Sequence, residues 1–454
     1  MNILSIRLRH DIIAEARRQG LSIPVAFYTG DWHSPIDGTQ AWACSETMQV
    51  DFPDSFAPDL PEAVLEETRR TGLTHYRRAY YRDFNRQFRH TASWIDVNYR
   101  FDNVVQYFWT LLRRERIDLV VFNDVPHMGN ATVVYHLAHA MGLKVLILRQ
   151  AFFPGNTWAA ERIEDLAVAG FAAHQGSTIP VEETLKSPFY MKGKQAMTRG
   201  DYLGRMLRHG AGLVASTLIL EFLWHRRGYE KSHIRLNETR QRYHHQRRFD
   251  AASISPDPDA KYIYFALHYQ PEMNTDIQGG DYVDQVLAIE KLARSIDDDT
   301  LIYVKENPIQ GGYMRDASFY TRLLAIPQVR LMPMDSSTFD LLRHARVVST
   351  ITGTVGWEAV QVGKPVICFG LTWYRGLPGV FEWRDDAGIV AKALGYEQDR
   401  AAFLAGVEDL STRLWKGGIQ QISVEQMEAS DRARNPEVIV SNIREIIARM
   451  TPDQ

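Results

Sequence analysis

One stretch of the sequence, residues 346–369, does most to limit what this chain can fold into. It opens with a β-branched, apolar run at 346–351, which is typical of a buried parallel strand. A small, flexible turn at 352–354 leads into an apolar helix of about ten residues. Gly363, Lys364 and Pro365 end that helix before a second apolar strand at 366–369. This order predicts a strand, a helix and a second, parallel strand in succession.

The turn in this stretch is a candidate phosphate site. A helix that starts after a glycine turn presents free backbone N–H groups and the positive end of its dipole. Here the turn consists of Thr352, Gly353 and Thr354. Glu358 follows one helical turn later, where its carboxylate would accept hydrogen bonds from ribose hydroxyls. An ordinary crossover, in which Gly353 is only a turn residue, explains this stretch equally well when it is considered alone.

The same alternation of strands and helices runs through the second half of the chain. Strands are predicted at 261–267, 301–304 and 329–331, with a helix at about 282–296, which together predict a parallel, doubly wound sheet. Polar residues follow these strands and should converge with the glycine turn, because parallel strands end at one edge of a sheet. They are His268, Gln270 and Glu272 after the first strand, and Lys305 and Glu306 after the second.

The first half of the chain predicts a second sheet of the same kind. A clear buried strand at 117–122 ends in Asp124 and His127, and a helix at 131–141 and a strand at 144–148 follow it. Asp124 and His127 therefore occupy positions that suit catalytic or acceptor-binding residues. Helix capping by Asp124 is the simpler alternative, because aspartate is a common N-cap. His33 also follows a predicted strand, although a surface loop is the simpler interpretation there.

Two segments differ in composition from the rest of the chain. Residues 60–116 are rich in arginine and tyrosine, which favours a solvated helix face over an RNA or anionic-sugar site. Residues 192–249 are basic and surround the apolar run 211–224, which Glu221 interrupts and which is too short to span a membrane. That run fits either a helix lying on an anionic membrane or a helical insertion packed between domains.

These features predict four parts of the chain. We expect residues 1–190 to form an N-terminal Rossmann-like domain, 191–255 a basic helical insertion or linker, 256–430 a C-terminal Rossmann-like domain with the candidate phosphate site, and 431–454 a closing helix. The proline-rich segment 253–260 is the best candidate linker.

Composition and missing motifs exclude several classes of protein. A net charge of −3 argues against a nucleic-acid binder. The sequence contains no P-loop, no dinucleotide fingerprint after its first strand, and no Asp-x-Asp with the flanking residues of a metal–diphosphate site. Two distant cysteines, Cys44 and Cys368, indicate a reducing compartment. The N-terminus lacks a signal peptide, so we expect a cytoplasmic protein, in peripheral contact with the inner membrane through its basic segment.

The predicted strand ends together suit a nucleotide-sugar donor. Lysine, histidine and a glycine turn supply positive charge and donors for a phosphate, and the two glutamates supply acceptors for sugar hydroxyls. The leaving nucleoside phosphate gains charge as the glycosidic bond breaks, and fixed donors would stabilise that charge.

Three motifs resemble the capsule polysaccharide biosynthesis family, which includes the β-Kdo transferases of bacterial capsule and lipopolysaccharide assembly. They are residues 267–272 (LHYQPE), 303–308 (YVKENP) and 351–358 (ITGTVGWE), followed by Gly363-Lys-Pro365. The resemblance implies a GT-B fold, in which two Rossmann-like domains face each other across a cleft. It also implies a metal-independent glycosyltransferase without a cofactor. By matching motif, the nucleotide, CMP if the donor is CMP-Kdo, would contact His268, Lys305, Thr352, Gly353, Thr354 and Glu358.

The sequence departs from this family at one important position. The resemblance implies a catalytic acid in the loop after the strand at 145–148, but that loop begins Arg149-Gln-Ala-Phe152. Asp124 is the nearest substitute and Glu161 a weaker one. We therefore expect Asp124 to act as general base or nucleophile, assisted by His127, with a glycan or glycolipid as acceptor. A UDP-sugar-dependent transferase, a nucleotide-sugar epimerase of the same fold and a non-catalytic glycan-binding scaffold remain as alternatives.

Overall fold

The computed structural model describes most of the chain as two compact units. Unit 1 comprises residues 1–180 and 404–454, and unit 2 comprises residues 181–403. The residues described are 1–28, 35–43, 80–81, 93–127, 129–173, 177–182, 196–223, 226–312, 314–386 and 388–450. His33, Cys44 and most of the predicted arginine- and tyrosine-rich helix lie outside them.

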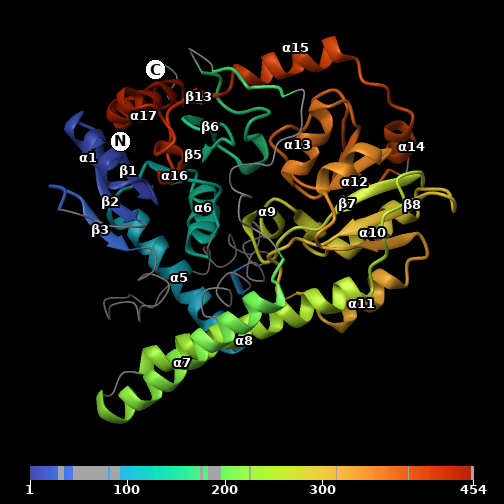
Figure 1. The fold of residues 1–454 in the computed structure, drawn as a ribbon. Coiled ribbons are helices and arrows are strands. Elements are labelled where there is room, and N and C mark those ends of the chain that lie inside the picture. The colour runs from blue at the N-terminus through green and yellow to red at the C-terminus, as the bar shows by residue number, and fades with distance from the viewer. Residues whose placement is uncertain are drawn as a thin grey trace. The chain divides into compact units, whose positions relative to one another are not determined.

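Unit 1 is built around a seven-stranded sheet (Figure 1). Its strand order is β13-β6-β5-β4-β1-β2-β3. The five strands from β5 to β3 are parallel, whereas β6 is antiparallel to both of its neighbours. The strands are β1 (Asn2–Ile6), β2 (Ser22–Tyr28), β3 (Gln40–Ala43), β4 (Leu119–Asn123), β5 (Lys144–Gln150), β6 (Asn156–Ala160) and β13 (Trp415–Lys416). The helices are α1 (His10–Arg18), α5 (Trp94–Arg114), α6 (Asn130–Ala140), α16 (Gln421–Val424) and α17 (Ala429–Met450), with a 3₁₀ turn at Ile163–Asp165.

Unit 2 contains a six-stranded, fully parallel sheet of order β12-β11-β10-β7-β8-β9. Taken in chain order, this is the doubly wound 3-2-1-4-5-6 arrangement of Rossmann folds. Its strands are β7 (Tyr262–Ala266), β8 (Leu301–Lys305), β9 (Val329–Met332), β10 (Val347–Thr350), β11 (Val366–Cys368) and β12 (Val380–Glu382). Its helices are α7 (Arg199–Leu223), α8 (Arg226–Ala251), α9 (Met273–Asp276), α10 (Gln285–Ala293), α11 (Ala317–Leu324), α12 (Thr338–His344), α13 (Thr354–Gln361) and α14 (Gly388–Leu394), with a 3₁₀ turn at Gly280–Val283. Helix α15 (Arg400–Ser411) leads back into unit 1.

The sheet of unit 2 forms because its strands bury both faces. Ile263 and Phe265 point to one side, where they join a core that includes Val286 and Ile289 of α10. Tyr264 alternates to the other side and is also fully buried. Helices α10, α11 and α12 each begin with a capping side chain. Asp284, Asp316 and Ser337 accept a backbone N–H from the first turn of these helices.

The C-terminal segment belongs to unit 1, in contrast to the predicted boundaries at 430 and 431. Strand β13 pairs with β6, and Ile439, Val440 and Ile443 of α17 share a buried core with Ile12 of α1. The hydrophobic face of α17 is covered only when this helix returns to the N-terminal sheet.

The basic segment is likewise part of unit 2 rather than a separate insertion. It forms the helix pair α7 and α8, which pack along each other (Figure 1). Phe249, near the end of α8, lies fully buried in the core of unit 2. Among the described residues, no helix has the length and apolar character that a membrane crossing requires.

Two Rossmann-like α/β units confirm the predicted fold class, which is that of the GT-B proteins. That the two domains face each other across a cleft stays a prediction.

Candidate functional site

The strand order of unit 2 reverses between β7 and β10, and this point marks its candidate site. In open parallel sheets, ligands bind beyond the carboxyl ends of the strands at such a switch point. His268 follows β7, and the turn Thr352-Gly353 follows β10. The side chain of His268 meets this turn directly, so two predicted segments converge here.

His268 joins the two strand ends through Nε2. This atom lies 2.9 Å from Oγ1 of Thr350 and accepts the backbone N–H of Thr352 at 3.2 Å. Because Nε2 accepts a hydrogen bond, the neutral ring carries its proton on Nδ1. Burial, aided by the charge of Arg315, lowers the pKa of His268 to about 4. His268 therefore supplies a neutral N–H donor at neutral pH, not the positive charge that the sequence suggested.

Gly353 is required at the turn by close packing. Its N–H donates to Oγ1 of Thr350 at 3.0 Å, and its carbonyl accepts the hydroxyl of Tyr374 at 2.6 Å. Its φ of −72° suits any residue. A Cβ atom, however, would lie 2.6 Å from Thr350 Oγ1 and 3.1 Å from Cε1 of His268. A side chain here would push the two strand ends apart, so Gly353 is more than a turn residue.

Lys305 lies at the end of β8 and is buried. Its Nζ donates to Oγ1 of Thr338 at 3.2 Å. Burial lowers the pKa of Lys305, while the charges of Asp335 and Glu306 act in the opposite direction. Thr338, the first residue of α12, also hydrogen-bonds Tyr264 of the central strand β7. Lys305 is thus held beside the strand that carries His268.

Glu358 lies in α13, one turn after Thr354, and is 8% exposed. Burial raises its pKa to about 8. At neutral pH the side chain is mainly a carboxylic acid, which can donate a hydrogen bond as well as accept one. Burial raises the pKa of the nearby Tyr264 hydroxyl, and the negative charge of ionised Glu358 raises it further. Lys305 and Glu358 therefore both lie near Tyr264, on the same face of the sheet.

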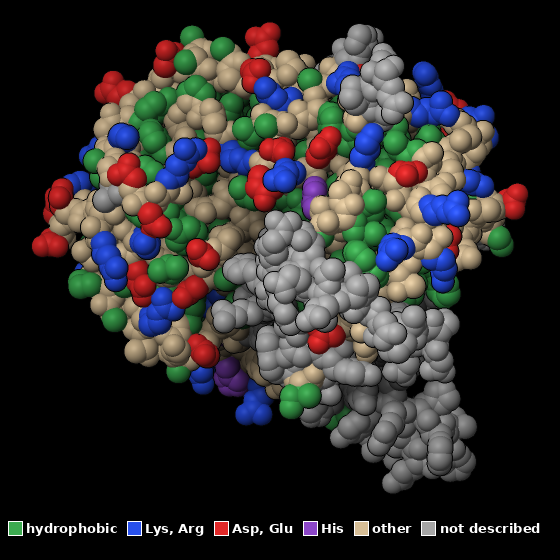
Figure 2. All heavy atoms as spheres, turned by 180° about the vertical axis from the view of Figure 1, so that it is seen from behind, with side chains coloured by type: hydrophobic (Ala, Val, Ile, Leu, Met, Phe, Trp, Pro, Cys, Tyr) green, Lys and Arg blue, Asp and Glu red, His purple; other side chains and the backbone are tan. Residues whose placement is uncertain are grey.

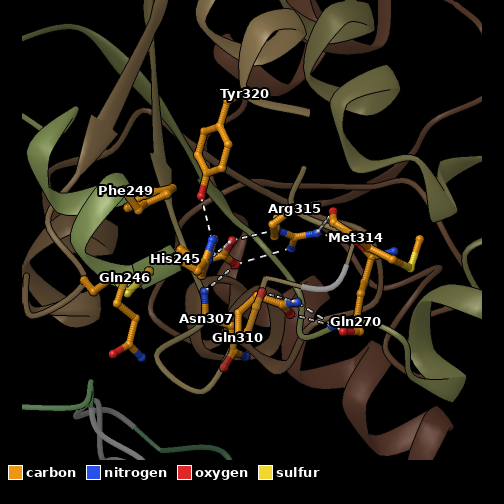
Figure 3. A network of polar contacts seen from close by, with 12 residues as sticks. His245, Gln246, Phe249, Gln270, Asn307, Gln310, Met314, Arg315 and Tyr320 are labelled. Atoms are coloured by element: carbon orange, nitrogen blue, oxygen red, sulfur yellow. Dashed lines mark hydrogen bonds and ion pairs between the residues drawn. The ribbon is translucent and has the colours of Figure 1, made fainter. Parts of the chain in front are cut away.

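Glu306 takes part in a buried ion pair. Its carboxylate is fully buried and forms an ion pair with Nε of Arg315 at 2.6 Å. Figure 3 shows Arg315, His245 and Tyr320, which belong to the same network of polar contacts. His245 of α8 lies 3.4 Å from the same carboxylate and 2.8 Å from the hydroxyl of Tyr320. Burial alone would raise the pKa of Glu306, but Arg315 and His245 outweigh it and hold the pKa at about 2. Arg315 and His245 thus contact the carboxylate of Glu306 within unit 2, and its predicted contact with the nucleotide stays a prediction.

Arg315, which the sequence analysis did not single out, connects this ion pair to the strand end. It donates to the carbonyl of His268 at 3.0 Å and to Oε1 of Gln270 at 2.8 Å. The side-chain amide nitrogen of Gln270 donates a hydrogen bond to the carbonyl of Val283 at 2.6 Å. These contacts hold the side chain of Gln270 within unit 2, and Arg315 fixes the backbone that carries His268.

The remaining predicted residues of unit 2 lie next to this junction. Oγ1 of Thr352 donates to the carbonyl of Asn274 at 3.0 Å, and Thr354 is the first residue of α13. Glu272 precedes α9, and its carbonyl accepts two backbone N–H groups of that short helix.

Unit 1 has its own switch point, between β1 and β4, and Asp124 follows β4 there. Its carboxylate accepts the N–H of Val125 at 2.8 Å and Nε2 of Gln420 at 3.1 Å. Asp124 has a φ of +122°, a conformation that L-residues rarely adopt. The N-cap of α6 is Gly129, which excludes the capping role considered for Asp124.

His127 lies close to the same point. Its Nδ1 donates to the carbonyl of Val125 at 2.6 Å, and its Nε2 faces Nη1 of Arg7 at 3.3 Å. Arg7, the residue after β1, and Gln420 join Asp124 and His127 in this cluster. No sequence pattern marked Gln420, because the C-terminal segment brings it to the cluster from a distance.

Glu161, the weaker substitute for the catalytic acid, lies away from the sheet edge that carries Asp124. It is exposed and follows β6, which runs antiparallel to β5. The end of β6 therefore lies beside the middle of β5, on the way back from the edge that carries Asp124.

One known protein family matches a large part of unit 2. Residues 215–387, which form much of unit 2, match the family model "Capsule polysaccharide biosynthesis protein". This match confirms the predicted resemblance to the capsule polysaccharide biosynthesis family over that segment.

Curated relatives match a shorter part of the chain. The capsule polysaccharide modification protein LipA of Neisseria meningitidis, from serogroups A and B, is 34% identical over 76 residues. This alignment covers 16% of the chain and only 10% of LipA.

Solved structures give weaker likenesses. The β-Kdo 2,7 transferase KpsC of Thermosulfurimonas dismutans has 13% identity and a TM-score of 0.31, over 69% of this chain and 83% of that one. The UDP-GlcNAc 2-epimerase of Methanocaldococcus jannaschii has 11% identity and a TM-score of 0.27, over 91% and 98%. Likenesses of this size do not determine an activity.

Proposed function

We propose that this protein is a GT-B glycosyltransferase of bacterial surface polysaccharide assembly, working on capsule or lipopolysaccharide. It transfers a sugar from a nucleotide donor, with CMP-Kdo favoured over a UDP-sugar, to a glycan or glycolipid acceptor. The reaction takes place in the cytoplasm and requires neither a metal nor a cofactor. The match of residues 215–387 to the capsule polysaccharide biosynthesis family supports the proposed role in surface polysaccharide assembly.

The observation that carries the proposal is the junction of His268 with Thr350, Thr352 and Gly353 at the switch point of unit 2. A neutral imidazole and the start of a helix at one strand edge support a phosphate site, because fixed donors stabilise the charge of a leaving phosphate. Lys305 supplies the positive charge. Glu358, as a neutral acid, binds a hydroxyl of the sugar or the ribose.

Replacing Lys305 with methionine tests the donor site. The substitution keeps the volume of the side chain and removes the cation, and we expect nucleotide affinity to fall about 10- to 100-fold, as for the loss of a charged hydrogen bond. Thermal-shift titrations with CMP, UDP, GDP and TDP compounds measure this change and identify the base, because a bound ligand raises the melting temperature.

Lys364→Met is the matched control for this experiment. Lys364 precedes β11 and donates to the carbonyl of Ala345, at the amino-terminal edge of the same sheet. Its loss should leave nucleotide binding unchanged. Equal affinities of the Lys305→Met variant and the wild type would refute the donor site.

In unit 1, we propose that Asp124 removes the proton of the acceptor hydroxyl, with Gln420 bonded to its carboxylate and His127 assisting. Asp124→Asn keeps the shape and removes the base, so kcat should fall about 100-fold while the donor affinity is unchanged. Acceptor-dependent release of nucleotide measures the rate and also separates a transferase from an epimerase, which would convert the donor alone.

Asp118→Asn is the control for Asp124, because Asp118 precedes β4 at the opposite edge of the sheet and binds the N-terminal segment. Full activity of the Asp124→Asn variant would exclude Asp124 as the base.

A further inference from the structure

Helix α7 presents two different faces over residues 199–215, where its side chains are described. One face packs on α8, where the ring of Tyr202 stacks on Tyr243 with 4.2 Å between the centroids. Met206 and Leu213, which lie at helical spacing from Tyr202, are partly buried on the same side. The pairing with α8 therefore accounts for one apolar face of α7 and leaves the other side to solvent.

The other side of α7 also carries large apolar residues. Leu203, Leu207 and Val214 are 50%, 74% and 60% exposed. Their spacing of four and seven residues puts them in one stripe along the helix. Arg205 and Arg208 are exposed beside this stripe. The term "outer face of α7" is used below for these five residues.

Positive charge is concentrated in the same helix pair. Residues 199–251 contain eleven arginines and lysines but only five aspartates and glutamates, in a chain whose net charge is −3. On the face of the molecule that Figure 2 shows, side chains of both signs are interspersed among the described residues. The helix pair is thus a basic region in an otherwise slightly acidic protein.

The helix pair is firmly attached to unit 2. Arg242 and Gln246 of α8 both donate to the carbonyl of Pro308, at 3.1 and 2.8 Å. His245 lies against the buried Glu306. Since α8 is anchored and α7 packs along it, the outer face of α7 is presented on a fixed support.

We propose that the outer face of α7 docks on the surface of a lipid bilayer that contains anionic lipid. An exposed leucine stripe gains free energy when it enters the boundary between headgroups and acyl chains, and arginines beside it bind anionic headgroups. Nucleic acid would use the charge but would leave the leucines in water. The inference does not depend on the proposed activity.

Vesicle sedimentation tests this proposal with the full-length protein. We expect binding to phosphatidylcholine vesicles that contain phosphatidylglycerol, weaker binding to phosphatidylcholine alone, and release as salt is raised. The double variant Leu203→Ser/Leu207→Ser should bind at least about 10-fold more weakly, because two leucines no longer enter the bilayer. Arg205→Gln/Arg208→Gln should weaken binding to the anionic vesicles by a similar factor and leave binding to neutral vesicles unchanged.

Leu324→Ser on α11 is the matched control, because Leu324 is 52% exposed and lies outside the helix pair. It should bind vesicles like the wild type. Equal melting temperatures would show that all variants are folded, and unchanged nucleotide binding would separate this surface from the donor site.

Three results would overturn the proposal. The first is no binding of the wild type to anionic vesicles. The second is equal binding of the leucine variant and the wild type. The third is a difference in oligomeric state between the leucine variant and the wild type in sedimentation velocity, with no vesicle binding by either protein. That result would make the outer face of α7 an interface between copies of the chain.

Discussion

Replacement of Arg315 with methionine is expected to lower the free energy of unfolding by about 3–5 kcal/mol, the usual cost of removing one partner from a buried ion pair. Arg315 and Glu306 both have side chains with no exposed surface. Without the guanidinium, the carboxylate of Glu306 would stay buried with only His245 and the backbone N–H of Asn307 as partners. Urea unfolding followed by circular dichroism would measure the loss.

Two further variants make this result specific. The double substitution Arg315→Met/Glu306→Gln removes both charges, so it should recover a large part of the lost stability. Arg322→Met breaks a partly exposed ion pair with Asp284 and Glu290, and should cost about 1 kcal/mol or less. If Arg315→Met and Arg322→Met lowered the free energy of unfolding by the same small amount, Arg315 would not be the support of the strand end.

The folded fraction of the Arg315→Met variant should also bind the donor nucleotide less well. Arg315 donates to the carbonyl of His268 and to Gln270, so it holds the residue whose ring joins the two strand ends. A stability effect alone would leave the affinity of the folded fraction unchanged.

The sequence was sufficient to place His268, Lys305 and Thr352 at one edge of a sheet. Buried parallel strands are continuous apolar runs, and their ends are visible where polar residues begin. The repeated alternation with helices then predicts the parallel order and the shared edge. These are local patterns, which is why they can be recognised without coordinates.

Other features depend on distant parts of the chain and could not be predicted. Glu306 and Lys305 are neighbours in sequence, but alternation along the strand end sends one toward Arg315 and the other toward Thr338. Gln420 reaches Asp124 only because the chain returns to unit 1 after residue 403. The antiparallel direction of β6 leaves no mark on its composition, so Glu161 could not be discounted from sequence alone.

The protonation of Glu358 is another property that burial, and not sequence, determines. A carboxylate at this position looks like an acceptor for sugar hydroxyls, yet burial raises its pKa from 4.5 to about 8. Because the folded pKa lies above the unfolded one, the folded protein binds the extra proton between about pH 4.5 and pH 8. This group therefore makes the protein less stable as the pH rises through that window.

The variant Glu358→Gln should remove this pH dependence. Glutamine has the same shape and no charge. The free energy of unfolding of the variant should therefore equal that of the wild type near pH 5 and exceed it near pH 9 by on the order of 4 kcal/mol, at about 1.4 kcal/mol for each unit of pKa. Urea unfolding of both proteins across this range is the measurement. Glu425→Gln, an exposed residue after α16, should leave the pH profile as it is in the wild type.

Parallel pH profiles of the Glu358→Gln variant and the wild type would mean that Glu358 is charged in the folded protein, as a simple acceptor would be. A difference that grows with pH would instead identify a neutral acid near Tyr264. Such an acid can donate a hydrogen bond to an oxygen of the donor without repelling its phosphate, whereas a carboxylate in the same place would oppose phosphate binding. Donor affinity should then fall above pH 8 in the wild type and stay constant in the variant, because only the wild type acquires a negative charge at the site.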